Sequence, residues 1–258
     1  MKTEISLERK CEDSKYDFLI YPFHTNKING LDICLKKHLV ATCGHDNSIR
    51  IWNYHTKTLD ICESFMDEPL TVAFHPFGLH LIVGFADKIR CYNICSRNLK
   101  VYQELFIKSC KEIKFANGGH LFACADNHNI KVYRFYQGDC PEGYTFKEHV
   151  NKVSSINWFD DDTGFVSTGI DGVCIAWRLN PDILEAANKR GMEEEKAIKS
   201  YIYKTEYRNG RFLDVAVRSE SKNTYYAITE DRHIKEIENG KEKIRFDTGV
   251  NYSSIATF

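Results

Sequence analysis

The sequence predicts an all-β fold, a β-propeller made of four-stranded blades, and three observations lead to that prediction. Segments that combine a turn, alternating apolar residues and an aromatic end at Trp52, Tyr92, Tyr133 and Trp177, at intervals of 40 to 44 residues. Two further period-2 runs precede each segment, and apolar runs follow several of them. A four-strand unit that recurs about every forty residues is typical of propellers, in which each blade buries its apolar face on the next.

The individual strands follow from the alternation of apolar and polar residues. Third strands are expected at 46–52, 87–92, 127–133 and 171–177, with a weaker fifth copy, Asp231–Ile237, after an insertion. First strands are expected at Ile28–Ile33, Leu70–Phe74, Ile113–Phe115 and Val153–Trp158. Second strands are expected at Leu39–Thr42, Leu81–Val83, Leu121–Cys124 and Phe165–Thr168, and fourth strands at Leu59–Phe65 and Val101–Phe106.

Both ends of the chain are predicted to fall inside blades. Ile5–Leu7 and Asp17–Tyr21 are expected to be the third and fourth strands of one unit, and Tyr252–Phe258 a first strand. We therefore expect one domain over residues 1–258, with about five complete blades and partial blade strands at both termini, which makes it an incomplete ring and a piece of a longer protein. Residues 180–198 are expected to be a charged insertion between strands, with a partner-binding projection as the alternative.

The composition excludes several classes of function. With 35 Lys and Arg against 36 Asp and Glu, the net charge of -1 offers no general attraction to nucleic acid or to anionic lipid. No apolar run approaches the about 18 residues that a membrane helix needs, and the first ten residues lack the apolar stretch of a signal peptide. We expect a cytosolic chain, whose ten cysteines are reduced and mostly buried.

Two of the repeats share a polar signature. In each, a histidine lies 28 residues before the tryptophan, 22 before an aspartate and 18 before a hydroxyl residue. The two sets are His24, Thr42, Asp46 and Trp52, and His149, Ser167, Asp171 and Trp177. A buried indole N–H needs an acceptor, which the hydroxyl supplies, and the hydroxyl can in turn donate to the imidazole. These spacings match the WD-repeat pattern of a structural tetrad, although the strand ends in Trp-Asn or Trp-Arg instead of Trp-Asp.

The same residue types would suit a hydrolase triad of Ser167, His149 and Asp171, which remains a remote alternative. We favour the structural interpretation for two reasons. The second set has Thr42 in the serine position and ends in the same tryptophan, which a nucleophile does not need. Neither hydroxyl lies in the Gly-x-Ser-x-Gly turn that exposes a nucleophile. We therefore expect no catalytic residue.

Three further candidate sites have simpler interpretations as turns. His75 and His80 flank a turn and lack additional metal ligands, so we expect a surface turn. Gly118-Gly119 lacks the Lys-Ser/Thr of a phosphate loop and is ordinary hairpin sequence. Asp160–Asp162 could bind calcium but is more simply a solvated turn. No metal and no cofactor is expected.

Several stretches carry a resemblance to one known family, and they are His24–Asp32, Ile49–Tyr54, Val83–Lys88, Asn117–Phe122 and Thr229–Glu236. They resemble the cilia- and flagella-associated WD-repeat protein 57 family, also called WD-repeat protein 65, and the similarity extends over nearly the whole chain. The resemblance implies a non-enzymatic axonemal scaffold that helps to assemble or position inner dynein arms and regulates motility. It implies protein partners, such as inner dynein arm components or tubulin-associated complexes, and a location in the axoneme, cytoplasm and cytoskeleton. A general cytosolic adaptor, for instance a ubiquitin-ligase substrate receptor, is the alternative.

The propeller prediction also places candidate partner contacts. In a four-strand meander, the connection between blades and the turn between second and third strands emerge at the same end of the ring. The face of a WD-repeat propeller at this end commonly binds other proteins. By this resemblance, we expect the contact residues to be Asn26, Lys27, His45, Asn151, Lys152 and Ile170.

Overall fold

The computed structural model describes residues 23–141, 144–182, 201–208, 210–218 and 224–255, without the side chains of 201–205. In these residues twenty strands form five four-stranded antiparallel sheets, each with its strands in sequence order. The first sheet contains β1 (Ile28–Cys34), β2 (Leu39–Gly44), β3 (Ser48–Asn53) and β4 (Thr58–Ser64). The second contains β5 (Thr71–Phe74), β6 (His80–Gly84), β7 (Ile89–Ile94) and β8 (Leu99–Leu105).

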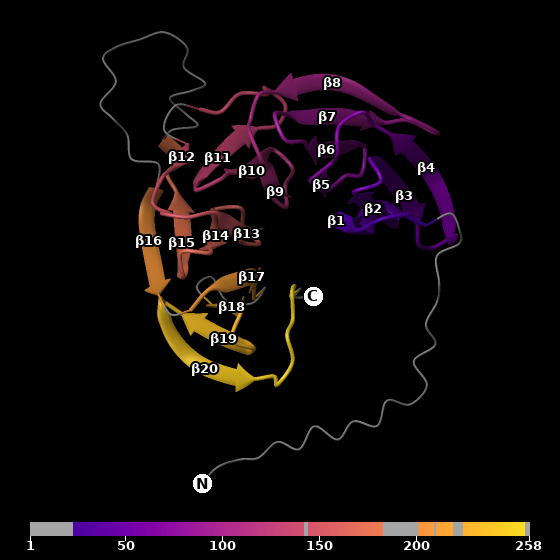
Figure 1. The fold of residues 1–258 in the computed structure, drawn as a ribbon. Helices are drawn as coiled ribbons and strands as arrows, with labels where there is room; N and C mark the ends of the chain where they lie inside the picture. Colours follow the sequence, from indigo (N-terminus) through magenta and orange to yellow (C-terminus); the bar gives the residue numbers. More distant parts are fainter. Residues whose placement is uncertain (1–22, 142–143, 183–200, 209, 219–223, 256–258) are drawn as a thin grey trace, which may run out of the picture.

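The remaining three sheets repeat this order. The third contains β9 (Cys110–Phe115), β10 (Leu121–Asp126), β11 (Asn129–Arg134) and β12 (Thr145–Phe146). The fourth contains β13 (Val153–Trp158), β14 (Gly164–Gly169), β15 (Val173–Leu179) and β16 (Tyr201–Arg208), and the fifth β17 (Phe212–Val217), β18 (Thr224–Thr229), β19 (His233–Glu238) and β20 (Lys241–Asp247). Figure 1 shows the sheets side by side around an arc, with β1, β5, β9, β13 and β17 innermost. The predicted all-β propeller fold is confirmed.

Neighbouring sheets bury their apolar faces on each other. In the fourth sheet, Ile175 and Trp177 of β15 belong to the cluster shared with the third sheet, where the ring of Phe146 lies 5.0 Å from that of Trp177. Cys174 lies on the other face of β15 and packs with Phe212 of the fifth sheet. Because successive side chains of a strand point to opposite faces, the alternating sequence gives each sheet two surfaces for two neighbours.

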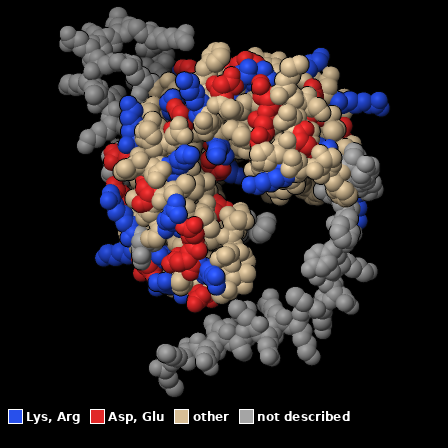
Figure 2. Space-filling model, in the orientation of Figure 1, with Lys and Arg blue, Asp and Glu red and all other residues tan. Residues whose placement is uncertain are grey.

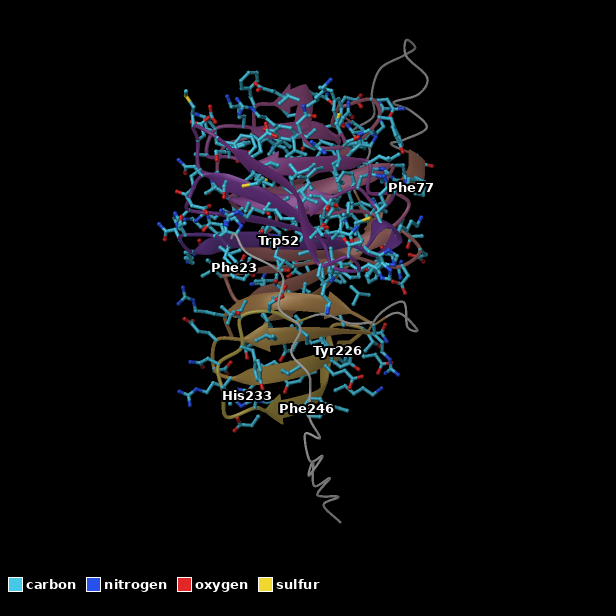
Figure 3. All side chains as sticks on the ribbon, turned by 90° about the vertical axis from the view of Figure 1, so that its right-hand side faces the viewer. Phe23, Trp52, Phe77, Tyr226, His233 and Phe246 are labelled. Carbon is cyan, nitrogen blue, oxygen red and sulfur yellow. The ribbon has the colours of Figure 1, made fainter. Side chains whose placement is uncertain are left out.

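The first sheet presents its Trp52 face away from the second sheet. Ile49 and Ile51 of β3 pack against the second sheet, whereas Trp52, on the opposite face of β3, stacks on Phe23 with ring centroids 6.3 Å apart. Figure 3 shows Phe23 and Trp52 lying close together on this face. The residues before Phe23 lie outside the described part of the chain.

The innermost strands also contact each other across the arc. Lys114 Nζ of β9 lies 3.4 Å from Asp32 Oδ1 of β1, which is two sheets away. The other oxygen of this carboxylate accepts the backbone N–H of Phe74 in β5, at 2.7 Å. Asp32 therefore joins the inner strands of three successive sheets.

The expected insertion and the expected terminal strands are only partly covered by the described residues. Most of 180–198 lies outside the described residues, as do Ile5–Leu7 and Asp17–Tyr21. The described part of the expected strand Tyr252–Phe258 contains no strand; instead, the carboxylate of Asp214 accepts the backbone N–H of Ile255 at 2.9 Å.

Nine cysteines are described, all as free thiols, and six of them are buried. No helix among the described residues is long and apolar enough to span a membrane.

Candidate functional site

The first polar cluster connects three segments of the first sheet. His24 precedes β1, and its Nδ1 lies 2.9 Å from Asp46 Oδ1 in the turn between β2 and β3. His24 Nε2 lies 2.8 Å from the hydroxyl of Thr42 on β2, which accepts the indole N–H of Trp52 on β3 at 3.1 Å. With Nδ1–H donating to the carboxylate, Nε2 can accept the Thr42 hydroxyl proton.

The second cluster has the same connectivity in the fourth sheet. His149 Nδ1 lies 3.1 Å from Asp171 Oδ2, and its Nε2 lies 2.8 Å from Ser167 Oγ. The indole N–H of Trp177 donates to the same Ser167 oxygen at 2.9 Å. The structure thus brings all four side chains of each set together, and Ser167 and Trp177 are completely buried.

Each aspartate also holds the backbone that leads into the sheet. Asp46 Oδ2 accepts the N–H of Thr25 at 3.1 Å, and Asp171 Oδ2 accepts the N–H of Val150 at 2.9 Å. The carboxylates therefore fix the segment after the histidine to the turn between the second and third strands. The meander brings these two kinds of loop to the same end of the sheet, and this contact joins one to the other.

A glycine before each of these turns makes room for the cluster, and the sequence reasoning missed both. A Cβ on Gly169 would lie 2.4 Å from Asp171 Oδ1 and 2.8 Å from His149 Nδ1. A Cβ on Gly44 would lie 2.8 Å from the carbonyl oxygen of Lys27. The signal was present in the sequence, because both glycines lie 20 residues after the histidine.

Burial and hydrogen bonding set the charge states in the clusters. Burial alone would raise the pKa of Asp46, but hydrogen bonds from Ser48, His24 and the backbone of Thr25 outweigh it and hold that pKa well below its usual range. Burial lowers the pKa of His149, and the nearby Asp171 carboxylate offsets part of this shift. The second cluster therefore contains a neutral imidazole at pH 7.

The candidate partner residues lie in the loops that the clusters join. The backbone N–H of His45 donates to the carbonyl of Lys27 at 2.8 Å, and that of Ile170 donates to the carbonyl of Lys152 at 2.9 Å. Asn26 and Asn151 have equivalent roles too, since each side chain accepts the next residue's N–H at 2.8 Å. Five of the six residues are exposed, and Ile170 is half-buried. We call these two loop pairs the upper face.

Three exposed apolar side chains at the same end of the sheets were not predicted. Met66, Phe106 and Val150 are 99%, 84% and 88% exposed, and each lies in the loop that leads from one sheet into the next. Their positions depend on loop lengths that vary between the repeats, so periodicity does not reveal them. Acidic and basic side chains are interspersed over the face seen in Figure 2, without a field of one sign.

Two of the residues assigned to surface turns have other roles. The turn beside His75 is at the surface, but His75 itself is buried, with Nε2 3.1 Å from the carbonyl oxygen of Gly119 in the next sheet. Asp162 is not a solvated turn residue, because its carboxylate accepts the N–H groups of Asn117 and Gly118 at 2.7 and 2.6 Å. Both contacts join first-to-second strand turns of neighbouring sheets, which a single repeat does not encode. Within the described residues, no group of three His, Cys, Asp or Glu side chains is placed to hold a metal ion.

Comparisons with known proteins agree with this architecture. The family model described as "WD domain, G-beta repeat" matches residues 18–53 and 141–178, which include both polar clusters. The mouse protein "Cilia- and flagella-associated protein 57" is 36% identical over 256 residues, or 98% of this chain. The chain belongs to the cilia- and flagella-associated protein 57 family. The predicted resemblance is confirmed.

Two further comparisons define the extent of this relationship. "Cilia- and flagella-associated protein 57 A" of Tetrahymena thermophila is 44% identical over 69% of the chain. The chain spans only 14% of that relative and 18% of the mouse protein. A crystal structure of the Cps50 (Swd1) β-propeller domain of Myceliophteria thermophila covers 91% of this chain, and the chain covers 77% of it, with a TM-score of 0.72 and 10% identity. That likeness concerns the fold alone.

Proposed function

We propose that this chain is a non-enzymatic protein-docking scaffold of a cilium or flagellum, and that it helps to position inner dynein arms on the axoneme and so regulates motility. The observation that carries the proposal is the 36% identity to a cilia- and flagella-associated protein along 98% of the chain. A rigid arc of sheets with loops fixed by hydrogen bonds suits docking, because little conformational entropy is lost when a partner binds.

We propose a structural role for both polar clusters. A hydrolytic serine needs an oxygen that a substrate can reach and a site that stabilises the developing oxyanion. Ser167 is completely buried, and its oxygen already accepts the indole N–H of Trp177. A buried hydroxyl that is already hydrogen-bonded to a buried indole favours a structural link between strands over a triad.

We propose that the upper face contacts the partner. Its candidate contact residues are Asn26, Lys27, His45, Asn151, Lys152 and Ile170, and the adjoining exposed apolar residues are Met66, Phe106 and Val150. Exposed apolar side chains surrounded by polar ones are typical of protein interfaces.

The decisive experiment is complementation in a ciliated cell that lacks the endogenous protein, using a tagged full-length form. We expect the tagged protein on the axoneme, with inner dynein arms restored in electron micrographs. A variant with Lys27→Glu and Lys152→Glu should lose most co-precipitation of inner-arm dynein heavy chains while folding normally. A tag spread through the cytosol and absent from axonemes would contradict the proposal and favour a general adaptor.

A further inference from the structure

A second exposed apolar surface lies on the side of the arc opposite the upper face. It is formed by the turns between first and second strands and between third and fourth strands of the first three sheets. In Figure 3, Phe77 lies at this side, away from Phe23 and His233 at the other. The proposed docking function does not use this side.

Four apolar side chains define this surface, which we call the lower patch. Leu35, Phe77, Leu79 and Tyr136 are each between 47% and 72% exposed. They come from turns of three different sheets, and ring contacts connect two of them. The buried ring of His75 lies 5.4 Å from that of Phe77 and 6.0 Å from that of Tyr136.

The lower patch rests on a fixed support. His75 Nδ1 accepts the backbone N–H of Phe77 at 3.2 Å, while Nε2 donates to the carbonyl of Gly119 at 3.1 Å. The thiol of Cys34 in the first sheet lies 3.7 Å from the carbonyl oxygen of Pro76. Because these contacts hold the turn from both neighbouring sheets, Phe77 is exposed in a defined position.

The rim of the lower patch is basic over the first two sheets, whereas the turn that contains Tyr136 has an acidic residue, Asp139, paired with Arg134. The turns at 34–38, 53–57, 75–79 and 94–98 contain Lys36, Lys37, Lys57 and Arg97 and no Asp or Glu, although the whole chain has a net charge of -1. Within the described part of the chain, Lys36, Lys37 and Arg97 form no ion pair. Lys36 Nζ lies 4.0 Å from the centroid of the Phe77 ring, so cation and aromatic ring adjoin directly.

We propose that the lower patch binds an acidic peptide segment of a partner protein, one that carries apolar side chains among its carboxylates. The apolar side chains of such a segment would cover Phe77 and Leu79, and its carboxylates would pair with Lys36, Lys37 and Arg97. A neutral apolar partner would leave these cations unpaired, and a basic one would be repelled. Charge complementarity therefore selects the acidic class.

The test measures fluorescence anisotropy of a labelled 14-residue peptide in which Glu residues alternate with Leu and Phe, titrated with the full chain. We expect saturable binding that weakens by about tenfold or more between low and moderate salt. Peptides with Gln or Lys in place of Glu should bind much more weakly. The double variant Lys36→Glu, Lys37→Glu and the single variant Phe77→Ser should each lower the affinity about tenfold.

A matched control separates the lower patch from general charge effects. Lys108→Glu with Lys111→Glu makes the same change in net charge at two exposed lysines near the start of β9, and should leave the affinity unchanged. All variants should keep the wild-type circular dichroism spectrum and thermal midpoint, since the altered side chains are exposed.

The proposal would be overturned if the wild-type chain did not bind the Glu peptide. It would also be overturned if the Lys peptide bound equally well, or if the lower-patch variants kept the wild-type affinity. Sedimentation showing that Phe77→Ser converts a dimer to a monomer would overturn it as well, because the patch would then bind a second copy.

Discussion

At the residue scale, each polar cluster is a chain of hydrogen bonds in which every donor points in the same direction, from the tryptophan to the aspartate. The indole N–H donates to a hydroxyl, the hydroxyl to Nε2 of the histidine, and Nδ1–H to the carboxylate, as at Trp177, Ser167, His149 and Asp171. In the second cluster, the Ser167 hydroxyl is the shared partner of Trp177 and His149. Removing one member therefore leaves its neighbours unsatisfied, and the cost is that of burying them unpaired.

Ser167→Ala is expected to lower the free energy of unfolding by about 1 to 3 kcal/mol, because Trp177 Nε1 and His149 Nε2 lose their shared partner. Urea denaturation followed by tryptophan fluorescence measures this. The control is Ser96→Ala in an exposed turn, which should change stability by less than about 0.5 kcal/mol. A Ser167→Ala protein as stable as the wild type would refute the structural link between strands.

Gly169→Ala is expected to destabilise the chain by about 1 to 3 kcal/mol, because the new methyl group would meet both Asp171 and His149. Gly44→Ala is the matched variant in the first cluster, where the contacts are less close, so its effect should be smaller. Chemical denaturation measures the free energy of unfolding of both variants and of the wild type. If both variants were as stable as the wild type, the clusters would have to accommodate the extra methyl group without cost.

The sequence predicted these clusters because their members recur at fixed spacings within one repeat. His75 and Asp162 were misread for the opposite reason. Their partners, Gly119 for His75 and the N–H groups of Asn117 and Gly118 for Asp162, belong to neighbouring sheets about 45 residues away in sequence. Such contacts depend on how two turns meet, which residue type and spacing do not specify.

At the element scale, first-to-second strand turns connect the first four sheets, each to the next. The carboxylate of Asp162 holds the turn of the third sheet through two backbone N–H groups. Asp162→Ala is expected to speed hydrogen exchange at the Asn117 and Gly118 amides about tenfold or more, since charge-assisted hydrogen bonds are the stronger ones. Asp160→Ala, at an exposed neighbour, should leave the rates unchanged. Unchanged rates in both variants would mean that the carboxylate does not protect the turn.

The buried turn histidine predicts a pH dependence. Burial lowers the pKa of His75, and the nearby His80 and Lys36 lower it further. The unfolded chain therefore binds more protons than the folded chain near and below pH 6.5, so stability falls as pH drops from 7 to 5. His149 acts in the same direction.

His75→Gln is expected to be less stable at pH 7 but to lose less stability between pH 7 and 5 than the wild type. Urea denaturation at both pH values measures the two slopes, and the exposed-site variant His128→Gln serves as the control. Equal slopes for His75→Gln and wild type would show that His75 does not carry this dependence.

At the scale of the whole molecule, the fold was predictable because one pattern is repeated five times. A strand with a weak pattern in one copy can therefore be assigned by its position in the other copies. The expected third strands agree with β3, β7, β11, β15 and β19 to within a few residues. The exposed loops were not predictable in the same way. Met66, Phe106 and Val150 were missed because loop sequences follow no period, whereas strands must alternate to bury two faces.

Each sheet packs mainly on its neighbours in the sequence, as in other repeat proteins. The second, third and fourth sheets have a described neighbour on both faces, while the first and fifth have one. We expect the amides of β7, β11 and β15 to exchange more slowly than those of β3 and β19 in native-state hydrogen exchange. Uniform protection across all five sheets would indicate one cooperative unit instead.

The contact between Lys114 and Asp32 departs from this nearest-neighbour rule, since it skips a sheet. The distance between Lys114 Nζ and Asp32 Oδ1 depends on how tightly the arc bends, because a flatter arc would move β1 and β9 apart. The distance between the two charged groups therefore reports the curvature of the arc. A spectroscopic label at either position would register a change in bending that a distant bound partner imposes.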